Sequence, residues 1–350
     1  MASIVHRNDR FLVVHYEYDE VSGKRKQKWE TYRTLADAKR RKAEIEHRQE
    51  LGVMNVPTCK TVADLLKEYV SLYGTTTWSL SVYSSNTRLI RNYINPVIGK
   101  MNLCEISPHI LEKYYQKLLK TPAVSHVTQK RGAKASGFVQ PATVRKVHSL
   151  LRSAFTQAVK WELMEKNPAL HATVPKAVPQ KREVWDSETI FLALDVCDDA
   201  RLKLAINLSF ACSMRIGEIL GLTWDCVDIS PQSIADGTAS IMIEKELQRV
   251  DKTAMKSLEQ KDVLFIFPQS SKRNKTMLVL KKPKTESSIR KVFIPKTVAR
   301  QLESWKREQE RTKEALGDEY ADHNLVLAHG LGSPVEQSRI TAMFQALIKK

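Results

Sequence analysis

The sequence has few of the features that mark secreted, membrane or metal-binding proteins. No run within its 350 residues approaches the roughly 20 consecutive apolar residues of a membrane helix, and residues 1–10 lack the apolar core of a signal peptide. Its five cysteines form no C-x-x-C pair, which argues against a disulfide framework and a zinc site. We expect these cysteines to be buried as small apolar residues. The absences predict a cytoplasmic protein with no bound metal and no membrane partner.

Acidic residues are too few to balance the basic ones. The chain has 56 lysines and arginines against 39 aspartates and glutamates, a formal net charge of +17. Residues 57–180 hold 17 of the basic residues and only 6 of the acidic ones, so the middle of the chain carries most of the excess. Basic surfaces gain affinity for nucleic acid by releasing phosphate counterions. The composition therefore predicts a polyanionic partner, with DNA as the first candidate.

The first 56 residues predict a small module of strands and one helix. The β-rich run from Phe11 to Tyr18 reaches a turn at Ser22-Gly23, and the run from Lys28 to Arg33 returns from it. Thr34 is a candidate helix cap, and we expect a surface helix from Leu35 to about residue 51. A module of this size is near the lower limit for independent folding.

Residues 57–172 predict an all-helical domain. Val62, Leu65, Leu66 and Tyr69 share one helical face. Further helices are expected at 80–95, at 108–120 after the cap Ser107, and at 142–161. Residues 124–140 have no periodicity and predict a flexible basic loop, and residues 173–182 predict a linker.

Residues 183–350 predict an α+β domain. Its pattern indicates helices at 187–197 and 199–220, strands between 224 and 295, and a helix at 296–316. The expected fold class is thus a multidomain chain: a small three-stranded β-sheet with a helix, an all-α domain, and an α+β domain.

Basic side chains of the middle region are candidates for contacts with DNA phosphates. On the helix expected at 142–161, Arg145, His148 and Arg152 recur every three or four residues and would lie opposite the apolar face. A merely solvated face is the competing interpretation, and the local charge favours phosphate contacts. The candidates are Lys130, Arg131 and Lys134 in the loop and Arg145, Lys146 and Arg152 on the helix.

The stretch from Ser209 to Ile229 is the most informative part of the sequence. Arg215 stands at an expected helix start, and Glu218 follows one turn later. Spacing alone favours an ordinary helical ion pair worth only about 0.2–0.5 kcal/mol. The full string, however, resembles the first arginine box of the tyrosine recombinases, an R-x-G-E run followed by leucines and a W-D-x-x-D-I strand. The resemblance implies that Arg215 binds the scissile phosphate and that Glu218 orients it.

A second box lies between Lys281 and Pro295. A lysine-rich turn at a sheet edge is commonly just solvated or a nonspecific phosphate contact. The string K-K-P-K-T-E-S-S-I-R-K-V-F-I-P nevertheless resembles a hairpin of the same family. The resemblance implies that Lys284 donates a proton to the leaving 5′ oxygen and that Arg290 supports the hairpin and the DNA contact. Lys281 and Lys282 remain competing assignments for the lysine.

Two further regions resemble the same family. Residues 87–106 and 154–168 are similar to parts of the core-binding domain of integrases, which would be of the SAM-like type. The first 56 residues are similar to the arm-binding domains of phage and conjugative-transposon integrases. The resemblance implies domains at 1–56 for arm-type DNA, at 57–172 for core DNA and at 183–350 for catalysis, with a homotetramer on double-stranded DNA.

Two elements of the family pattern are missing from the sequence. None of the nine histidines has an arginine three residues later, so the H-x-x-R box is absent, and Tyr320 is the last tyrosine. Residues 325–334 and 340–350 resemble the segment just before that box. We therefore expect a chain truncated before its nucleophilic tyrosine and inactive in cleavage, with Tyr320 packing beside Leu316 rather than reacting.

The resemblance implies a site-specific recombinase that integrates or excises a mobile element through a 3′-phosphotyrosyl link. Such a link conserves the bond energy, so the chemistry needs neither a cofactor nor a metal. A regulator that occupies recombination sites without cutting them is the alternative, and a type IB topoisomerase is a second. The expected location is the cytoplasm, on the nucleoid.

Overall fold

The computed structural model describes residues 2–7, 9–18, 25–50, 60–124, 137–176, 184–269, 271 and 273–349. The chain forms two compact units, one of residues 1–69 with 90–176 and the other of residues 70–89 with 177–350. Among the described residues, no helix combines the length and apolar character needed to cross a bilayer.

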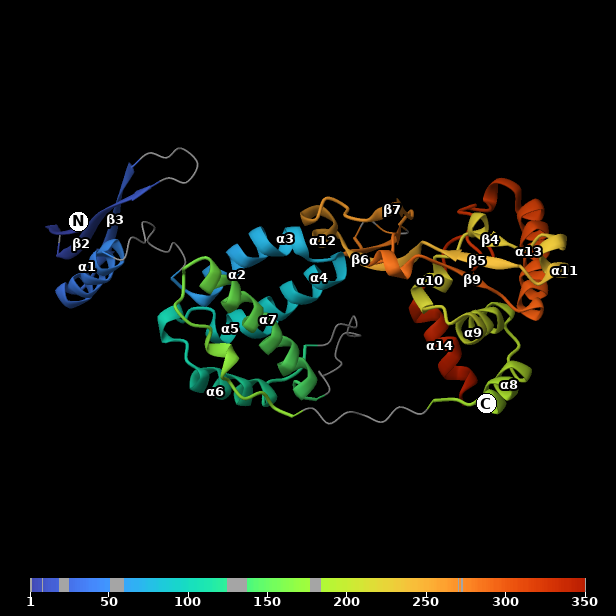
Figure 1. The fold of residues 1–350 in the computed structure, drawn as a ribbon, viewed down its shortest axis with the longest axis horizontal. Coiled ribbons are helices and arrows are strands. Elements are labelled where there is room, and N and C mark those ends of the chain that lie inside the picture. The colour runs from blue at the N-terminus through green and yellow to red at the C-terminus, as the bar shows by residue number, and fades with distance from the viewer. Residues whose placement is uncertain are drawn as a thin grey trace. The chain divides into compact units, whose positions relative to one another are not determined.

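The N-terminal module has the predicted strands and helix. Strands β1 (Ser3–Arg7), β2 (Arg10–Tyr18) and β3 (Arg25–Tyr32) form an antiparallel sheet in the order β1-β2-β3, and α1 (Leu35–Glu50) packs on it (Figure 1). Thr34 caps α1, since its Oγ1 accepts from the Asp37 amide at 3.2 Å. Val13, Ala38 and Ile45 are fully buried between the sheet and the helix. The predicted turn at Ser22-Gly23 lies outside the described residues.

Beyond α1, the helices of the first unit follow the predicted apolar pattern. They are α2 (Val62–Glu68), α5 (Asn95–Ile98), α6 (Pro108–Leu119) and α7 (Pro141–Lys160), with π-helical residues Ile90–Ile94 and short 3-10 turns at Leu103–Glu105 and Pro168–Leu170. Ser107 caps α6 by accepting from the Ile110 amide. Tyr115 and Phe155 are fully buried where α6 and α7 pack together.

The second unit begins with residues 70–89, which include α3 (Thr75–Thr77) and α4 (Leu80–Leu89). A π-helical segment, Tyr69–Gly74, comes directly before α3. Helices α8 (Ser187–Asp195), α9 (Ala200–Cys212) and α10 (Ile216–Leu220) follow. The prediction of one helix over 199–220 was wrong, because Ser213 takes a left-handed conformation, φ 52°, and ends α9 before Arg215.

The region from Trp224 to Pro295 forms two sheets. Strands β4 (Val227–Asp228), β5 (Ser240–Ile243) and β9 (Arg290–Phe293) make one. Strands β6 (Glu246–Asp251), β8 (Thr276–Lys281) and β7 (Val263–Ile266) make the other, in that order. Helices α11 (Pro231–Asp236) and α12 (Lys252–Ser257) interrupt what was predicted as strands only. The strands β8 and β9 lie in different sheets, so the predicted hairpin over Lys281–Pro295 was wrong.

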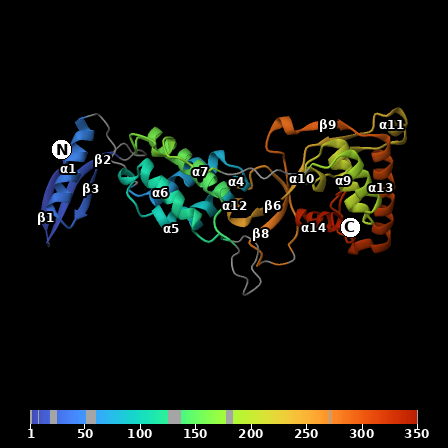
Figure 2. The ribbon, with the colours of Figure 1, turned by 90° about the horizontal axis from the view of Figure 1, so that it is seen from below.

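Two helices complete the second unit. Helix α13 (Lys296–Leu316) has the predicted bounds, packs on α9 and α11, and runs along the side of this unit that Figures 1 and 2 draw in red-orange. Helix α14 (Gln337–Leu347) packs on α9 and α10. Short 3-10 turns lie at Trp224–Cys226, Glu286–Ser288 and Gly317–Glu319.

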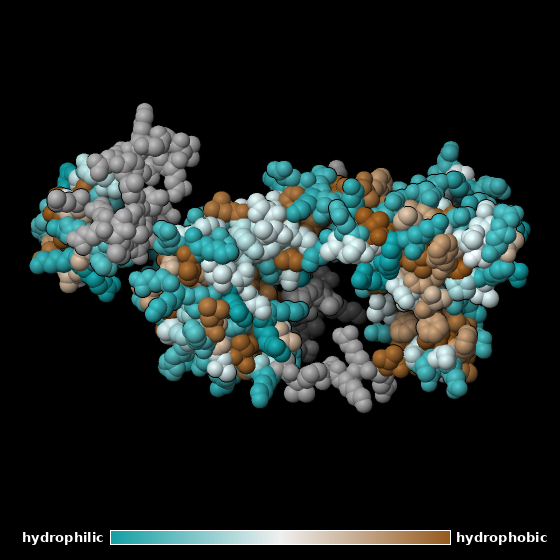
Figure 3. Space-filling view, in the orientation of Figure 1, coloured by the Kyte–Doolittle hydropathy of each residue, from teal (hydrophilic) through white to brown (hydrophobic). Residues whose placement is uncertain are grey.

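An apolar groove of about 840 Å³ is bounded by α8, α9 and α14. Trp185, Phe210, Phe344 and Ile348 are among the residues that line it. Tan and brown residues gather over α9 and α14 in Figure 3. The groove adjoins the core of this unit, in which Leu204, Leu208 and Ile219 are buried.

Candidate functional site

Arg215 lies at the start of α10, where the chain turns after Ser213. Its own backbone is extended (φ −74°, ψ 151°), which makes it the N-cap residue of α10. Its side chain is 70% exposed, yet Nη1 donates to Glu218 Oε1 at 2.9 Å and the backbone amide donates to Glu218 Oε2 at 3.0 Å. The guanidinium is therefore both held and open to solvent.

Glu218 is the buried centre of this group. Its side chain is only 2% exposed, and it accepts hydrogen bonds from two arginines. Burial by itself raises the pKa of this carboxyl, but the hydrogen bonds from Arg290 and Arg215 outweigh it and hold the pKa below its ordinary value. Because this carboxylate is buried and shared, the pair differs from the exposed helical ion pair that the spacing alone would suggest.

Arg290, from the segment Lys281–Pro295, contacts Glu218 of the segment Ser209–Ile229. Located at the start of β9, it donates from Nη2 to Glu218 Oε2 at 2.9 Å and from Nη1 to Glu218 Oε1 at 3.2 Å. The same guanidinium donates to the backbone oxygens of Ser288 and Ser213 at 3.1 and 3.3 Å. Arg290 thus ties the strand after the lysine-rich turn to both ends of the break between α9 and α10.

The three candidate lysines have different surroundings. Lys281 is 3% exposed, and its Nζ lies 3.2 Å from Glu246 Oε1. Lys282 and Lys284 are exposed. A buried and paired ammonium is poorly placed to meet a phosphate, so the surroundings favour the two exposed lysines.

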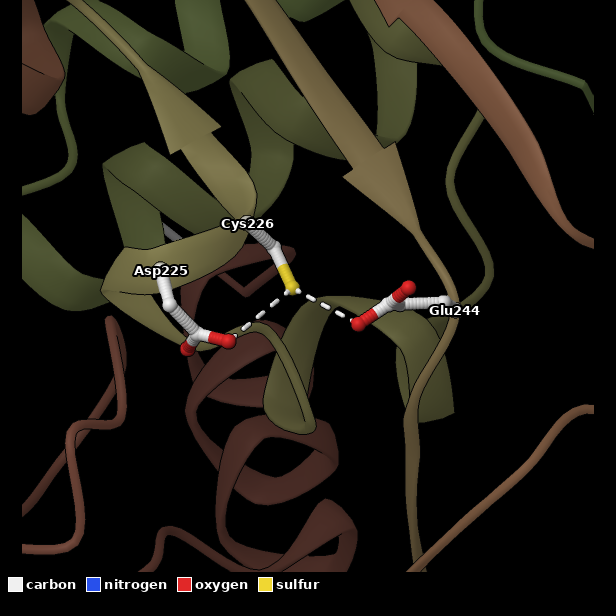
Figure 4. Close-up of side chains that lie close together, drawn as sticks. All are labelled: Asp225, Cys226 and Glu244. Carbon is white, nitrogen blue, oxygen red and sulfur yellow. Dashed lines mark hydrogen bonds between the residues drawn. The ribbon is translucent and has the colours of Figure 1, made fainter.

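Cys226, Asp225 and Glu244 lie close enough for their Sγ and carboxylate oxygens to hold a metal ion (Figure 4). A cation is already present, because Lys245 Nζ lies 2.5 Å from Asp225 Oδ2 and 3.6 Å from Glu244 Oε1. Burial raises the pKa of the Asp225 carboxyl, and the hydrogen bond from Lys245 outweighs this and lowers the pKa overall. We regard the group as an ion-pair network that anchors β5.

Tyr320 has a structural environment. It is 9% exposed, and its hydroxyl accepts a hydrogen bond from Gln309 Nε2 at 3.0 Å. Gln309 also bridges to the Trp224 indole, which donates at 2.7 Å. These contacts place the Tyr320 side chain within the fold, and the expected packing beside Leu316 stays a prediction.

The basic residues of α7 lie on its exposed side. Arg145, Lys146 and Arg152 are exposed, opposite the fully buried Val144 and Leu151. His148 was predicted to share this exposed face, but it is half-buried and its Nδ1 lies 3.0 Å from the Tyr115 hydroxyl. The loop residues Lys130, Arg131 and Lys134 lie outside the described residues.

The cysteines divide between two environments. Cys197, Cys212 and Cys226 are buried as expected, whereas Cys104 is exposed, which the sequence did not predict. Cys59 lies outside the described residues.

The sequence did not identify Ser213 or Glu246 as parts of this site. Ser213 contributes a backbone oxygen and a left-handed turn, and a serine carries no reliable signal for that conformation. Glu246 could have been suspected only by knowing that β6 pairs with β8, a pairing between segments about thirty residues apart.

Comparison with solved structures identifies the fold. The chain is similar to the Tn1549 transposon integrase, solved in complex with circular intermediate DNA, at a TM-score of 0.58 and 15% identity, over 83% of this chain and 78% of that one. At this identity the likeness shows that the two chains share a fold.

Sequence comparison then supports the family. Residues 61–119 match the model of the phage integrase N-terminal SAM-like domain. The chain is 24% identical over 270 residues to a XerC-like tyrosine recombinase of Caldanaerobacter subterraneus subsp. tengcongensis, covering 74% of this chain and 59% of that protein. It is 21% identical over 335 residues to an integrase of Streptomyces ambofaciens, covering 94% and 73%. These matches support a tyrosine recombinase, as the two boxes indicated.

Proposed function

We propose that the chain is a site-specific tyrosine recombinase that binds attachment-site DNA, holds the scissile phosphate and acts in integrating or excising a mobile element. The arrangement of Arg215, Glu218 and Arg290 is the observation that carries the proposal. Related proteins include the ICEBs1 integrase of Bacillus subtilis, 24% identical over 214 residues, which cover 61% of this chain and 50% of that protein. The Tn1549 integrase binds transposon DNA in its solved complexes.

Arg215 is suited to hold the scissile phosphate. In the described parts of the chain, only Nη1 of its guanidinium has a hydrogen-bond partner, which leaves the other N–H groups toward solvent. A guanidinium can hold two non-bridging oxygens while negative charge develops on them. Glu218, by fixing Nη1 and the backbone amide, lowers the conformational freedom that the arginine would lose on binding.

Lys284 is the proposed general acid of the same step. Attack of a tyrosine hydroxyl on phosphorus would form a phosphotyrosyl bond and break the bond to the 5′ oxygen, which then needs a proton. An exposed lysine ammonium in the turn before Arg290 can supply that proton. Arg290, with both Nη atoms engaged internally, would support Arg215 more than it would contact DNA.

Duplex binding is proposed for three surfaces. The exposed basic side of α7 and the loop containing Lys130, Arg131 and Lys134 would contact phosphates of the core site. Residues 1–56 would bind arm-type sites, and the assembled form on DNA would be a homotetramer. The proposed domains are 1–56, 57–172 and 183–350, joined by a linker at 173–182.

A non-cleaving DNA-binding regulator is the second candidate function. The specific observation in its favour is the internal hydrogen bond of the Tyr320 hydroxyl. Both functions predict DNA binding, and neither predicts a covalent adduct from a tyrosine within these 350 residues.

One experiment tests DNA binding and whether a tyrosine within the chain acts as the nucleophile. Duplexes selected by the chain from a random-sequence library would be end-labelled, titrated across a salt series and checked for protein–DNA adducts on denaturing gels. We expect tight, salt-sensitive binding that Arg145→Ala weakens, without an adduct from these 350 residues. Binding that is weak and insensitive to salt would contradict the proposal. An adduct would show that a tyrosine within the chain is the nucleophile.

A further inference from the structure

Lys281 forms an ion pair within the protein, with Glu246. It is the last residue of β8, and in the register of the sheet it stands directly opposite Glu246 of β6. The side chain of Lys281 is 4% exposed and that of Glu246 is 26% exposed. Their 3.2 Å ion pair therefore lies mostly away from solvent, where a charge without its partner would be costly.

Glu246 also lies against the helix that positions Arg215. A Cβ added to Gly221, just after α10, would lie 2.6 Å from the carbonyl carbon of Glu246 and 2.5 Å from the amide nitrogen of Leu247. The backbones of α10 and β6 are thus in direct contact at this point. Strand β6 is consequently a direct neighbour of the helix that bears Glu218.

The far end of β6 is fixed as well. Arg249 donates from Nε to Glu336 at 3.0 Å, just before α14, and from Nη1 to Thr276 Oγ1 at 3.0 Å. On the other side of the Lys281 pair, the Lys282 amide donates to the Asp262 oxygen at 2.9 Å. The chain is therefore held up to residue 282, only two residues before Lys284.

We infer that Lys281 and Glu246 are positioning residues for Lys284. Their ion pair holds the start of the lysine-bearing turn against β6, and β6 contacts α10. The position of the turn and the position of Arg215 therefore both depend on β6. Lys281 would hold the turn in place and would not itself meet the phosphate. This inference rests on the proposed function, in which Lys284 and Arg215 act on one phosphate.

The test measures the reactivity of individual lysines in the full chain. Each lysine would be acylated with a limiting amine-reactive ester, with and without a short mixed-sequence duplex at low salt, and its rate read by mass spectrometry. We expect the duplex to slow acylation at Lys284 and at Lys146 on α7. In Lys281→Met the slowing should be lost at Lys284 and kept at Lys146, because the DNA is still bound but the turn is no longer held.

Three further variants separate positioning from general destabilisation. Lys256→Met removes the same charge from an exposed residue of α12 and should leave the slowing at Lys284 unchanged. Lys281→Arg keeps a cation opposite Glu246 and should restore it. Glu246→Gln keeps a hydrogen-bonding partner of the same size, and should lose the slowing even if Lys281→Met proves too unstable to purify.

The outcomes distinguish this inference from the proposed function. Slowing at Lys284 that persists in both Lys281→Met and Glu246→Gln would overturn the positioning role and leave the function intact. A duplex that slows Lys146 but never Lys284 in the unsubstituted chain would overturn the role of Lys284, and the positioning inference with it. No slowing at either lysine would contradict DNA binding itself.

Discussion

Arg290 and Glu218, 72 residues apart in the sequence, meet through two hydrogen bonds of 2.9 and 3.2 Å. The same carboxylate accepts Nη1 of Arg215 at 2.9 Å. One buried group therefore serves two cations, one of them largely internal and the other exposed. The orientation of Arg215 depends on this shared carboxylate, and so on the strand β9 that delivers Arg290.

We predict that Glu218→Gln destabilises the second unit by about 3 kcal/mol at neutral pH, because two guanidinium groups lose the charge that compensates them. Urea unfolding followed by hydrogen exchange of α10 and β9 peptides would measure the change. The matched control is Glu286→Gln, which removes an exposed carboxylate from the lysine-rich turn and should change stability by less than about 0.5 kcal/mol.

The destabilisation caused by Glu218→Gln should also depend on pH. The folded-state pKa of Glu218 is lower than its ordinary value, so the folded form binds its proton less readily than the unfolded form. Its contribution to stability is present above the unfolded pKa, about 4.3, and is lost as the pH falls through the lower folded pKa. The difference in unfolding free energy between the unsubstituted chain and Glu218→Gln should therefore shrink from about pH 6 toward about pH 3, the range in which a carboxylate titrates. A constant gap would contradict this assignment.

Arg290→Ala should lower stability much more than Arg215→Ala. Arg290 is 30% exposed and bonds to Glu218, Ser288 and Ser213, whereas Arg215 is 70% exposed. Exposed ion pairs contribute about 0–1 kcal/mol, so we expect Arg215→Ala to stay within that range. Thermal unfolding of the two variants side by side would decide, and equal losses would show that Arg215 has a structural role.

Loss of the basic side of α7 should weaken duplex binding and reduce its dependence on salt. If Arg145 and Arg152 each neutralise one phosphate, each alanine variant should lower the slope of log affinity against log salt by about 0.9. Arg307→Ala, which removes an exposed arginine of α13, is the control and should leave the slope unchanged. If neither Arg145→Ala nor Arg152→Ala changes the slope, these arginines do not contact DNA phosphates and the exposed side of α7 is merely solvated.

Local periodicity predicted the elements that are shaped by local interactions. Helix α13 has the expected bounds, Thr34 and Ser107 cap their helices, and Val62, Leu65 and Leu66 face the core. The nearness of Arg215 and Glu218 also followed from their spacing on one helical turn.

Long-range pairing was beyond the sequence pattern. The strands β8 and β9 were expected to form one hairpin, but β8 pairs with β6 and β7 while β9 pairs with β5. Alternating residues show only that a strand has two faces and do not identify its partner. The break at Ser213 was missed because a serine carries no reliable signal for a left-handed conformation. That conformation is held here by the Ser213 amide, which donates to the Leu208 oxygen at the end of α9, and by the Arg290 bond to the Ser213 backbone oxygen.

The contact between α10 and β6 gives a last prediction, from two glycines four residues apart. Gly221→Ala would place a Cβ 2.5 Å from the Leu247 nitrogen, and because the neighbour is backbone, α10 and β6 would have to separate. We expect the free energy of unfolding to fall by about 3 kcal/mol or more, at the upper end of the cost of overpacking.

Gly217→Ala is the matched control, since its nearest neighbour, the Leu247 oxygen, is at 3.4 Å and alanine favours the helix by up to about 1 kcal/mol. If urea unfolding shows similar small effects for both variants, α10 and β6 are not in backbone contact in solution. A large loss for Gly221→Ala alone would mean that the helix holding Glu218 depends on β6 for its position, as the role inferred for Glu246 requires.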